Sequence, residues 1–319
     1  MIEITGLRKS YESRKRRKTT TVEAVRGVDL TVAGGEIFGF LGPNGAGKTT
    51  TLRMLATLIP PDAGDAVIAG CDLRADPAGV RRNIGYIAQG GSTWDDVTAR
   101  EELVLQARMH GISKAEAQTR AVAALEAFEL TEYADRNCKT YSGGQRRRVD
   151  IALGIIHGPK VIFLDEPTSG LDPQSRAHMW DEVRRLRSEG MTIFLTTHYL
   201  EEADALCDRI AIIDAGRIVA EGTPADLKRE ISGDVVTVSV REEFSEKAAE
   251  LLAGQPYLRS VDARENGELR LNVDTGETAI PQIMRTLEGA GVEMATIELH
   301  RPTLDDVFLT KTGRSLRES

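Results

Sequence analysis

A segment near the start of the chain, GPNGAGKTT at residues 42–50, constrains the fold more than any other feature. It has the spacing Gly-x-x-x-x-Gly-Lys-[Ser/Thr], with Gly42, Gly47, Lys48 and Thr49 in the defining places. The apolar run EIFGFLG predicts a strand before it, and GKTTTLRMLATLI predicts a helix that begins within it. A glycine-rich turn between a strand and a helix lets backbone N–H groups point at phosphate oxygens. The segment therefore predicts a phosphate-binding loop in an α/β domain.

A second segment, VIFLDEP at residues 161–167, would complete a nucleotide site. In the phosphate loop, Lys48 would reach the β and γ phosphates, and the Thr49 hydroxyl could bind Mg²⁺. The apolar run of the second segment predicts a buried strand, and Asp165 at its end would hold Mg²⁺ through water. Glu166 follows, where a carboxylate can polarise an attacking water beside the γ phosphate. Strands that end in acids are common, so this prediction depends on the pairing with the phosphate loop.

Three further polar features stand out at the ends of predicted elements. The turn Ser142-Gly143-Gly144 in KTYSGGQRRRVDIA begins a predicted helix, Gln89 lies in IGYIAQGG, and His198 lies at the end of MTIFLTTH. A single glutamine or histidine is more often structural than catalytic. However, polar residues at the ends of parallel strands gather at the sheet edge where ligands bind, so Gln89 and His198 are predicted to join the site. The glycine turn could bind a second anion or complete a site on another molecule.

The pattern of predicted elements changes near residue 230. Before it, apolar strands alternate with amphipathic helices, which indicates an α/β domain; residues 100–135 are predicted to be helical, and a hairpin is predicted to turn at Ala215–Gly216. After it, the order is β-α-β-β-α-β, with a hairpin turning at Asn266–Gly267 and a last helix in TLDDVFLTKTG, as in ferredoxin-like domains. The predicted divisions are residues 1–228 for the first domain, about 90–158 for a helical subdomain within it, and 229–319 for a small α+β domain.

Six motifs together resemble the ATP-binding subunits of ATP-binding-cassette transporters. The resemblance covers residues 1 to about 225, and the motifs stand in the family's order. They are GPNGAGKTT (phosphate loop), Gln89 (Q-loop), YSGGQ at 141–145 (signature), LDEP with Asp165 and Glu166 (Walker B), SGLD at 169–172 (D-loop) and His198 (switch histidine). The resemblance implies a P-loop NTPase cassette, with a RecA-like core, a mixed sheet and a helical subdomain, that takes ATP and Mg²⁺ as ligands.

The resemblance also implies roles for the matching positions. Glu166 would be the general base, His198 would hold the γ phosphate, and Gln89 would contact the attacking water and link the site to a membrane partner. The residues that would bind ATP are Tyr11, Gly42, Pro43, Asn44, Gly45, Ala46, Gly47, Lys48, Thr49 and Thr50, and those that would bind Mg²⁺ are Thr49, Gln89 and Asp165. The residues that would reach a second copy of the chain are Ser142, Gly143, Gly144 and Gln145, which would close over its ATP, and Asp172.

Within that family, the chain is similar to the daunorubicin-resistance type of drug exporter subunit, which carries a C-terminal extension. The similarity rests on YSGGQRRRVDIALGIIHGPKVIFLDEPTSGLDPQSR, TTHYLEEADALCDRIAIIDAGRIVAEGTP and the closing RPTLDDVFLTKTG. It implies an ATPase that powers export of a drug, antibiotic or lipid through a separate integral membrane permease. The chain would work as a homodimer, peripherally attached at the cytoplasmic side of the membrane. The C-terminal domain would support the dimer or sense a ligand.

The alternative is a cassette ATPase that acts on DNA or on ribosomes. Lys48 and Ser142 are only 94 positions apart, which leaves no room for the long coiled coil of the DNA-acting relatives. The formal charge of −8 also argues against a protein that coats nucleic acid, so no nucleic-acid partner is expected. The three cysteines have no disulfide or zinc spacing, and no window approaches the roughly 20 apolar residues that span a bilayer.

Two groups of basic residues have less specific expectations. The run Arg14–Lys18 is expected to be a solvated loop between two strands, or to contact acidic lipid headgroups or a partner. Arg146, Arg147 and Arg148 follow the signature and are expected on the surface, at least two of them on a solvated helix face. One of them could pair with a carboxylate across an interface. Tyr141 stands where the family usually has leucine, and its side chain is expected to pack.

Overall fold

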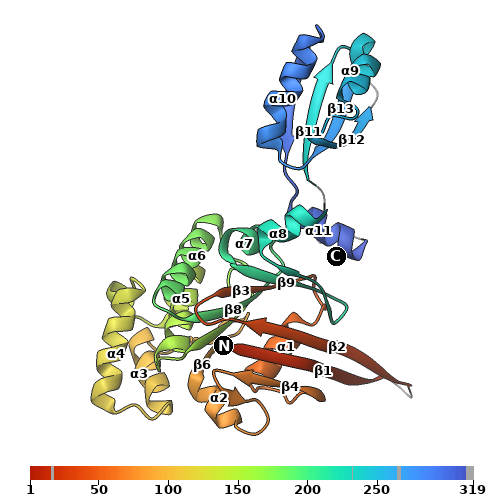
Figure 1. The fold of residues 1–319 in the computed structure, drawn as a ribbon. Helices are drawn as coiled ribbons and strands as arrows, with labels where there is room; N and C mark the ends of the chain where they lie inside the picture. Colours follow the sequence, from red (N-terminus) through yellow and green to blue (C-terminus); the bar gives the residue numbers. More distant parts are fainter. Residues whose placement is uncertain (16–17, 232, 264–266, 314–319) are drawn as a thin grey trace. The chain divides into compact units, whose positions relative to one another are not determined.

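The computed structural model describes residues 1–15, 18–231, 233–263 and 267–313, and it divides the chain into two compact units (Figure 1). The first unit is Met1–Gly222, and the second begins at Thr223. The sequence places the boundary at residue 228, which falls inside helix α8 (Pro224–Ile231). That helix packs on α11 (Leu304–Thr312), near the end of the second unit.

The central sheet of the first unit is mixed, as the sequence predicts. Its strand order is β10-β9-β3-β8-β7-β6, in which the neighbours from β9 to β6 are parallel and only β10 is antiparallel. Every residue of β3, β7 and β8 is buried, which is typical of parallel strands covered on both faces. The strands are β3 (Ile37–Leu41), β6 (Ile84–Ile87), β7 (Val161–Asp165), β8 (Thr192–Thr197), β9 (Arg209–Asp214) and β10 (Arg217–Gly222).

The predicted hairpin between β9 and β10 turns at Ala215–Gly216, as expected from the sequence. Both turn residues have positive φ angles, 45° at Ala215 and 80° at Gly216. Two central residues with positive φ are what the tightest hairpin turns require. The Gly216 N–H also donates to the carbonyl of Ala46, so this turn lies against the phosphate loop.

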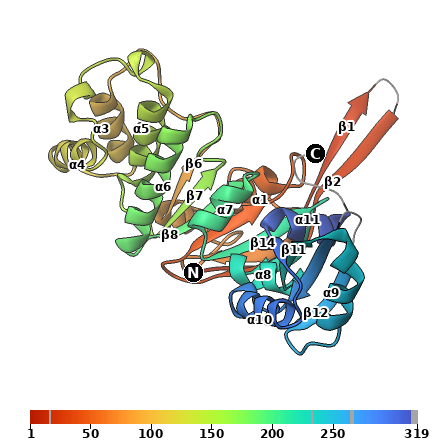
Figure 2. The same ribbon diagram turned by 90° about the horizontal axis from the view of Figure 1, so that it is seen from above.

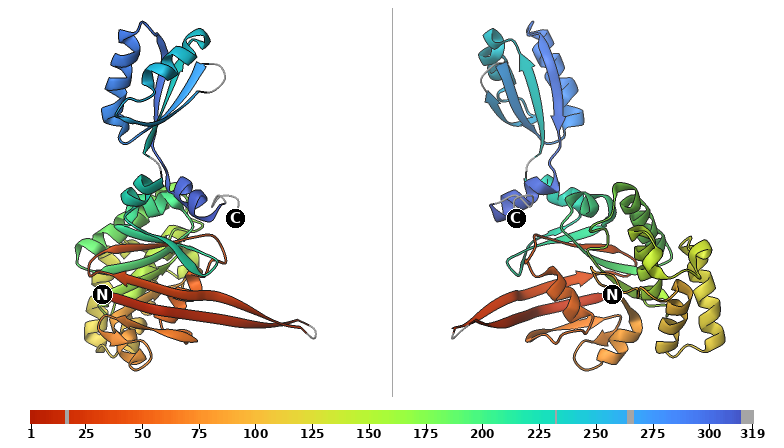
Figure 3. Two further views of the ribbon diagram at one scale, coloured as in Figure 1. Left: turned by 45° about the vertical axis from the view of Figure 1, so that its right-hand side comes forward. Right: turned by 180° about the vertical axis from the view of Figure 1, so that it is seen from behind.

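A second, antiparallel sheet in the order β2-β1-β4-β5 completes the first unit. Figure 3 shows β1 and β2 side by side along their described length. Arg14, Lys15 and Lys18 of the basic run lie in these strands instead of in the predicted loop, while residues 16 and 17 lie outside the described residues. The strands are β1 (Ile2–Lys15), β2 (Lys18–Val32), β4 (Ala63–Ile68) and β5 (Cys71–Asp72).

One hydrophobic core joins the two sheets and helix α1 (Lys48–Leu55). It contains Leu7 and Val28 from the second sheet, Phe163 and Phe194 from the central sheet, and Leu52 from α1, all of them fully buried. The ring of Phe194 lies within 6 Å of three other phenylalanine rings, centroid to centroid. Because α1 is held inside this core, the loop that precedes it is anchored at both ends.

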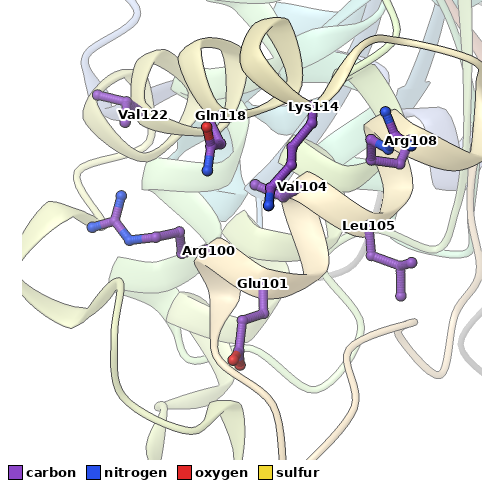
Figure 4. Close-up of a pocket in the computed structure, with 8 residues that line it drawn as sticks. All are labelled: Arg100, Glu101, Val104, Leu105, Arg108, Lys114, Gln118 and Val122. Atoms are coloured by element: carbon purple, nitrogen blue, oxygen red, sulfur yellow. The ribbon is translucent and has the colours of Figure 1, made fainter.

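The predicted helical subdomain consists of α3, α4 and α5, which lie side by side next to the central sheet (Figure 2). Thr98 begins α3 with a capping box to Glu101, and Ser113 caps α4. A groove of about 600 Å³ lies between α3 and α4, with Val104, Leu105 and Val122 among its walls (Figure 4). The helices of the first unit are α1, α2 (Pro77–Asn83), α3 (Ala99–Met109), α4 (Lys114–Ala127), α5 (Gly143–Ile155), α6 (Pro173–Ser188) and α7 (Leu200–Leu206), with 3₁₀ turns at Thr131–Tyr133 and Cys138–Thr140.

The second unit has the predicted β-α-β-β-α-β order. Its four strands form an antiparallel sheet in the order β12-β13-β11-β14, and α9 and α10 pack on the sheet. This is the strand order of ferredoxin-like domains. Of the predicted turn Asn266–Gly267, Asn266 lies outside the described residues. The elements are β11 (Asp234–Val240), a 3₁₀ turn (Glu242–Phe244), α9 (Ser245–Leu252), β12 (Leu258–Ala263), β13 (Glu268–Val273), α10 (Gly276–Gly289) and β14 (Met294–His300).

Candidate functional site

The phosphate loop connects β3 to α1 and depends on two glycines. Gly47 has a φ of 107°, and a Cβ atom at this position would lie 2.3 Å from the carbonyl oxygen of Ala24. A Cβ at Gly42 would lie equally close to the carbonyl oxygen of Ile213. Any larger residue would therefore displace the backbone of a neighbouring strand. The fold needs glycine at both of these positions, which the motif defined.

Lys48 is the first residue of α1, and its ammonium group lies inside the loop. Its Nζ donates to the carbonyl oxygens of Gly42 at 2.7 Å and Pro43 at 3.1 Å, and lies 3.4 Å from Oε1 of Glu166. Burial lowers the pKa of Lys48, although the negative charge of Glu166 acts in the opposite direction. A buried cation at a helix N-terminus favours binding of an anion.

Three other predicted site residues meet at Glu166. The Gln89 amide donates to its Oε2 at 2.8 Å, and Nδ1 of His198 lies 3.1 Å from the same oxygen. Lys48 approaches the other oxygen. Burial disfavours the charged carboxylate, but the interaction with His198 and the charge of Lys48 outweigh it, so the pKa of Glu166 lies below its ordinary value. The structure thus contains a buried, charged carboxylate whose orientation is set from three sides.

Asp165 and Thr49 form an adjacent cluster of oxygen atoms. The Thr49 hydroxyl donates to Oδ1 of Asp165 at 3.1 Å, and the Thr196 hydroxyl donates to the same oxygen at 2.7 Å. Thr196 also accepts the backbone N–H of Glu166 at its Oγ1, at 3.0 Å. Thr196 is a site residue that the sequence prediction missed, although its place at the end of β8, two residues before His198, could have indicated it.

The side-chain hydrogen bonds of the signature turn, Ser142-Gly143-Gly144, are made within α5. Ser142 caps α5, accepting the N–H of Gln145, whose side chain in turn accepts the N–H of Ser142. Ser142 and Gly143 are exposed, and a Cβ at Gly144 would lie 2.9 Å from Oγ of Ser175 on α6. Within the described part of the chain, no hydrogen bond or ion pair links this turn to the phosphate loop. Gln145 serves as a local cap here, a role that the sequence prediction did not give it.

Two other predicted residues lie outside the Glu166 cluster. Asp172 caps α6, where it accepts the N–H groups of Gln174 and Ser175 and the Ser175 hydroxyl. Tyr11 lies in β1 opposite Val22 and is exposed, as an adenine-stacking residue would need to be. In the residues that the structure covers, neither side chain forms a hydrogen bond or an ion pair with the phosphate loop.

The expectation that the arginines after the signature lie on the surface is wrong for Arg147. Its side chain is buried, and its guanidinium donates to three backbone carbonyls from other segments. Arg146 and Arg148 are half-buried and pair with Asp95 and Glu129 within the same chain. The rotation of α5 about its axis decides which of the three arginines faces the sheet. A run of consecutive arginines does not reveal that rotation. Tyr141 is buried, so the expectation that this position packs is confirmed.

The comparisons with protein-family models divide the chain into two matched regions. The model described as ABC transporter matches residues 25–169. The model described as the C-terminal domain of ATP-binding protein DrrA1-3-like proteins matches residues 222–312. In the described residues, no helix is long and apolar enough to cross a membrane.

Curated relatives match nearly the whole chain. It is 43% identical to the daunorubicin/doxorubicin resistance ATP-binding protein DrrA of Streptomyces peucetius, over 98% of this chain and 92% of the relative. It is 34% identical to the linearmycin resistance ATP-binding protein LnrL of Bacillus subtilis, over the full length of both. The Nod factor export ATP-binding protein I of Burkholderia lata is 38% identical over 92% of this chain and 93% of its own. These relatives do not favour the alternative of a role on DNA or ribosomes.

Solved structures match about 70% of the chain. A dimeric ATP-binding cassette in a post-hydrolysis state, bound to ADP and Pi, has a TM-score of 0.63 and 26% identity, over 70% of this chain and 98% of its own. The ATP-binding subunit of an ABC transporter has a TM-score of 0.62 and 30% identity, over 72% and 92%. Fold, phosphate loop and relatives agree that the chain binds ATP and is an ATPase. The chain belongs to the family of ATP-binding subunits of ATP-binding-cassette transporters, in the group of the daunorubicin-resistance proteins.

Proposed function

We propose that this chain hydrolyses ATP with Glu166 as general base and thereby powers the export of a drug, antibiotic or lipid through a separate membrane permease. The observation that carries the proposal is the convergence of Gln89, His198 and Lys48 on the Glu166 carboxylate. The interactions with His198 and Lys48 outweigh the effect of burial, so that carboxylate is charged at neutral pH and can accept a proton from water. The resistance and export names of the relatives support the cargo class.

The other residues of the site would bind and orient ATP. Lys48 and the loop N–H groups would hold the phosphates, because the glycines let the loop turn at the N-terminus of α1, where those N–H groups can point at an anion. Gln89 would orient the attacking water, and His198 would contact the γ phosphate from the end of β8. Tyr11 would stack on the adenine.

Mg²⁺ would bind beside Thr49 and Asp165. Their oxygens lie 3.1 Å apart, and a hydroxyl with a carboxylate is a donor set that Mg²⁺ prefers, since it takes its remaining ligands from phosphates and water. Gln89 directs its amide nitrogen at Glu166, which leaves its carbonyl oxygen for the cation. The cation would neutralise negative charge on the phosphate oxygens.

A second copy of the chain would complete the site. Ser142 and Gly143 are exposed at the N-terminus of α5, where a hydroxyl, N–H groups and the helix dipole suit a phosphate on another molecule. The dimeric solved cassette supports this arrangement. Ser142→Arg should block ATP-dependent dimerisation, measured by light scattering, and leave ATP binding by the monomer intact. Ser113→Arg, which removes an equivalent cap from α4, is the matched control, and a Ser142→Arg protein that still dimerises would contradict the proposed arrangement.

The permease would dock on a groove whose lining includes Ser92 and Trp94, which come shortly after Gln89 in the sequence. The exposed side chains of Leu58, Trp94, Leu105 and Met109 line one groove of about 430 Å³. Exposed apolar side chains gathered in a groove are typical of a protein-binding surface. This surface would attach the subunit to the cytoplasmic side of the membrane. Met109→Glu should abolish co-purification with the permease but keep ATPase activity, and unchanged co-purification would place the docking surface elsewhere.

The catalytic assignment is tested by two substitutions. Glu166→Gln keeps the size and polarity of the side chain but removes the base, so kcat should fall by about 10²-fold or more while ATP affinity changes little. Lys48→Ala should lose ATP binding, measured by calorimetry. Near-normal hydrolysis by Glu166→Gln would exclude Glu166 as the base. Unchanged ATP affinity in Lys48→Ala would overturn the phosphate-loop assignment.

A further inference from the structure

We propose that Arg147 and Asp150, on the signature helix α5, are positioning residues for hydrolysis that hold Gln89 and Glu166 in place. The inference rests on the proposed function, in which those two residues act on the attacking water. Neither Arg147 nor Asp150 belongs to the six motifs, and the run of three arginines does not distinguish Arg147 from its neighbours. The structure places both side chains in the interior, on the side of α5 that faces the catalytic segments.

Arg147 binds the backbone just before Gln89 and on both sides of Glu166. Its Nη1 donates to the carbonyl oxygen of Ala88, the residue before Gln89, at 2.8 Å. Its Nε and Nη2 donate to the carbonyl oxygens of Pro167 at 2.9 Å and Asp165 at 3.3 Å. These two residues flank Glu166. One planar guanidinium thus connects the chain at Gln89 with the chain at Glu166, whose side chains are themselves hydrogen-bonded.

Asp150 holds the other end of the Q-loop. Its Oδ1 accepts the N–H groups of Ser92 at 2.6 Å and Thr93 at 3.2 Å, three and four residues after Gln89. Gly91, which lies between Gln89 and Ser92 in the sequence, has a φ of 77°, and a Cβ there would lie 2.9 Å from Oδ2 of Asp150. The loop can therefore approach the carboxylate this closely only with glycine at that position. Together the two side chains bind the backbone before and after Gln89.

The two residues stand three positions apart, so they occupy one face of α5, and Nη1 of Arg147 lies 3.9 Å from Oδ2 of Asp150. Burial disfavours both charges: it lowers the pKa of Arg147 and raises that of Asp150. A buried ion pair of this kind stabilises the fold less than apolar packing of similar volume would. The hydrogen bonds of the pair to five backbone groups instead specify the positions of the two segments that carry Gln89 and Glu166. The same helix, α5, is capped by Ser142, the residue proposed to contact the ATP of the second copy.

The inference predicts a loss of turnover that ATP binding does not share. Arg147→Lys keeps the positive charge beside Asp150 but cannot present three donors in one plane, so the protein should fold and bind ATP with an affinity within about twofold of the parent. We expect kcat to fall by about tenfold. Arg147→Met, which leaves Asp150 without its cation, should lower kcat further. Arg120→Met is the matched control, since Arg120 also pairs with a carboxylate and donates to a backbone carbonyl, but on α4, away from the Q-loop.

A double-mutant cycle with Gln89→Ala separates positioning from general damage. If Arg147 acts through Gln89, Arg147→Lys should lower kcat about tenfold in the parent protein. It should lower kcat less than about threefold in a protein that already carries Gln89→Ala. A normal kcat in Arg147→Lys would overturn the inference, and equal losses in both backgrounds would overturn the part of it in which Arg147 acts through Gln89. If Gln89→Ala and Glu166→Gln both left turnover unchanged, the proposed function itself would fail. If they lower turnover and Arg147→Lys does not, only the positioning role fails.

Discussion

The stability of the first unit should fall steeply in mild acid because of one half-buried histidine. His157 follows α5, and its ring stacks on that of His110 with centroids 3.7 Å apart and planes 6° from parallel. Its Nε2 lies 2.9 Å from the carbonyl oxygen of Ile84 and must carry a proton to donate to it, while the buried Nδ1 has no hydrogen-bond partner among the described residues. Burial, with a smaller contribution from His110, lowers the pKa of His157 to about 4.

The size and sign of the effect follow from proton linkage. The unfolded chain takes up a proton on His157 near pH 6.5, but the folded protein does so only near pH 4. Above pH 6.5 both states are neutral and this group contributes fully to the free energy of unfolding. Between these pH values the unfolded state binds more protons, so stability is lost as the pH falls, by about 1.4 kcal/mol for each pH unit and about 3 kcal/mol in all.

The assay compares the wild-type protein with His157→Gln in urea titrations between pH 7.5 and 4.5. Both tryptophans of the chain, Trp94 and Trp180, lie in the first unit, so their fluorescence reports the unfolding of the unit that contains His157. Gln can still donate to the carbonyl of Ile84 but does not titrate. The wild type should therefore lose about 2 kcal/mol more than the variant between pH 6.5 and 5. Parallel stability curves for the two proteins would refute the reasoning.

Three further changes test the phosphate loop, the core and the Asp165 cluster. Gly47→Ala would place a Cβ 2.3 Å from the carbonyl oxygen of Ala24, so binding of a fluorescent ATP analogue should weaken by at least about tenfold, and normal affinity would contradict the loop geometry. Phe194→Ala removes a ring packed on three others and should lower the free energy of unfolding by about 3–5 kcal/mol in urea, a loss that an exposed ring would not produce. Thr196→Val removes a donor to Asp165 and should lower kcat more than ATP affinity, whereas equal changes would assign Thr196 to binding.

The cluster around Glu166 could be predicted from the sequence because connectivity determines it. Gln89, Glu166 and His198 each follow a strand of one parallel sheet, and the carboxyl ends of such strands meet at one edge. Apolar runs locate the strands, so the residues after them can be placed together without knowledge of any contact. The order of elements in the second unit follows in the same way from alternating strands and helices.

The arginines and the basic hairpin could not be predicted in this way. Which face of α5 is buried depends on how the helical subdomain packs, and three consecutive arginines give no periodic signal. Arg147 is buried because it meets backbone carbonyls, and a carbonyl acceptor leaves no trace in the sequence. The strands at Arg14, Lys15 and Lys18 extend into a charged run because their ladder bonds use only backbone groups.

Binding of ATP and activation of the base are expected to be linked through Lys48. In this structure its ammonium group contacts the Gly42 and Pro43 carbonyls and lies 3.4 Å from Glu166, so phosphate oxygens would compete for the same cation. The charge of Lys48 helps to depress the pKa of Glu166. When phosphates draw Lys48 away, that contribution weakens, the pKa of Glu166 rises toward its ordinary value, and the carboxylate becomes a stronger base while Gln89 and His198 keep its orientation. The loop that binds the substrate thereby also tunes the group proposed to act on it.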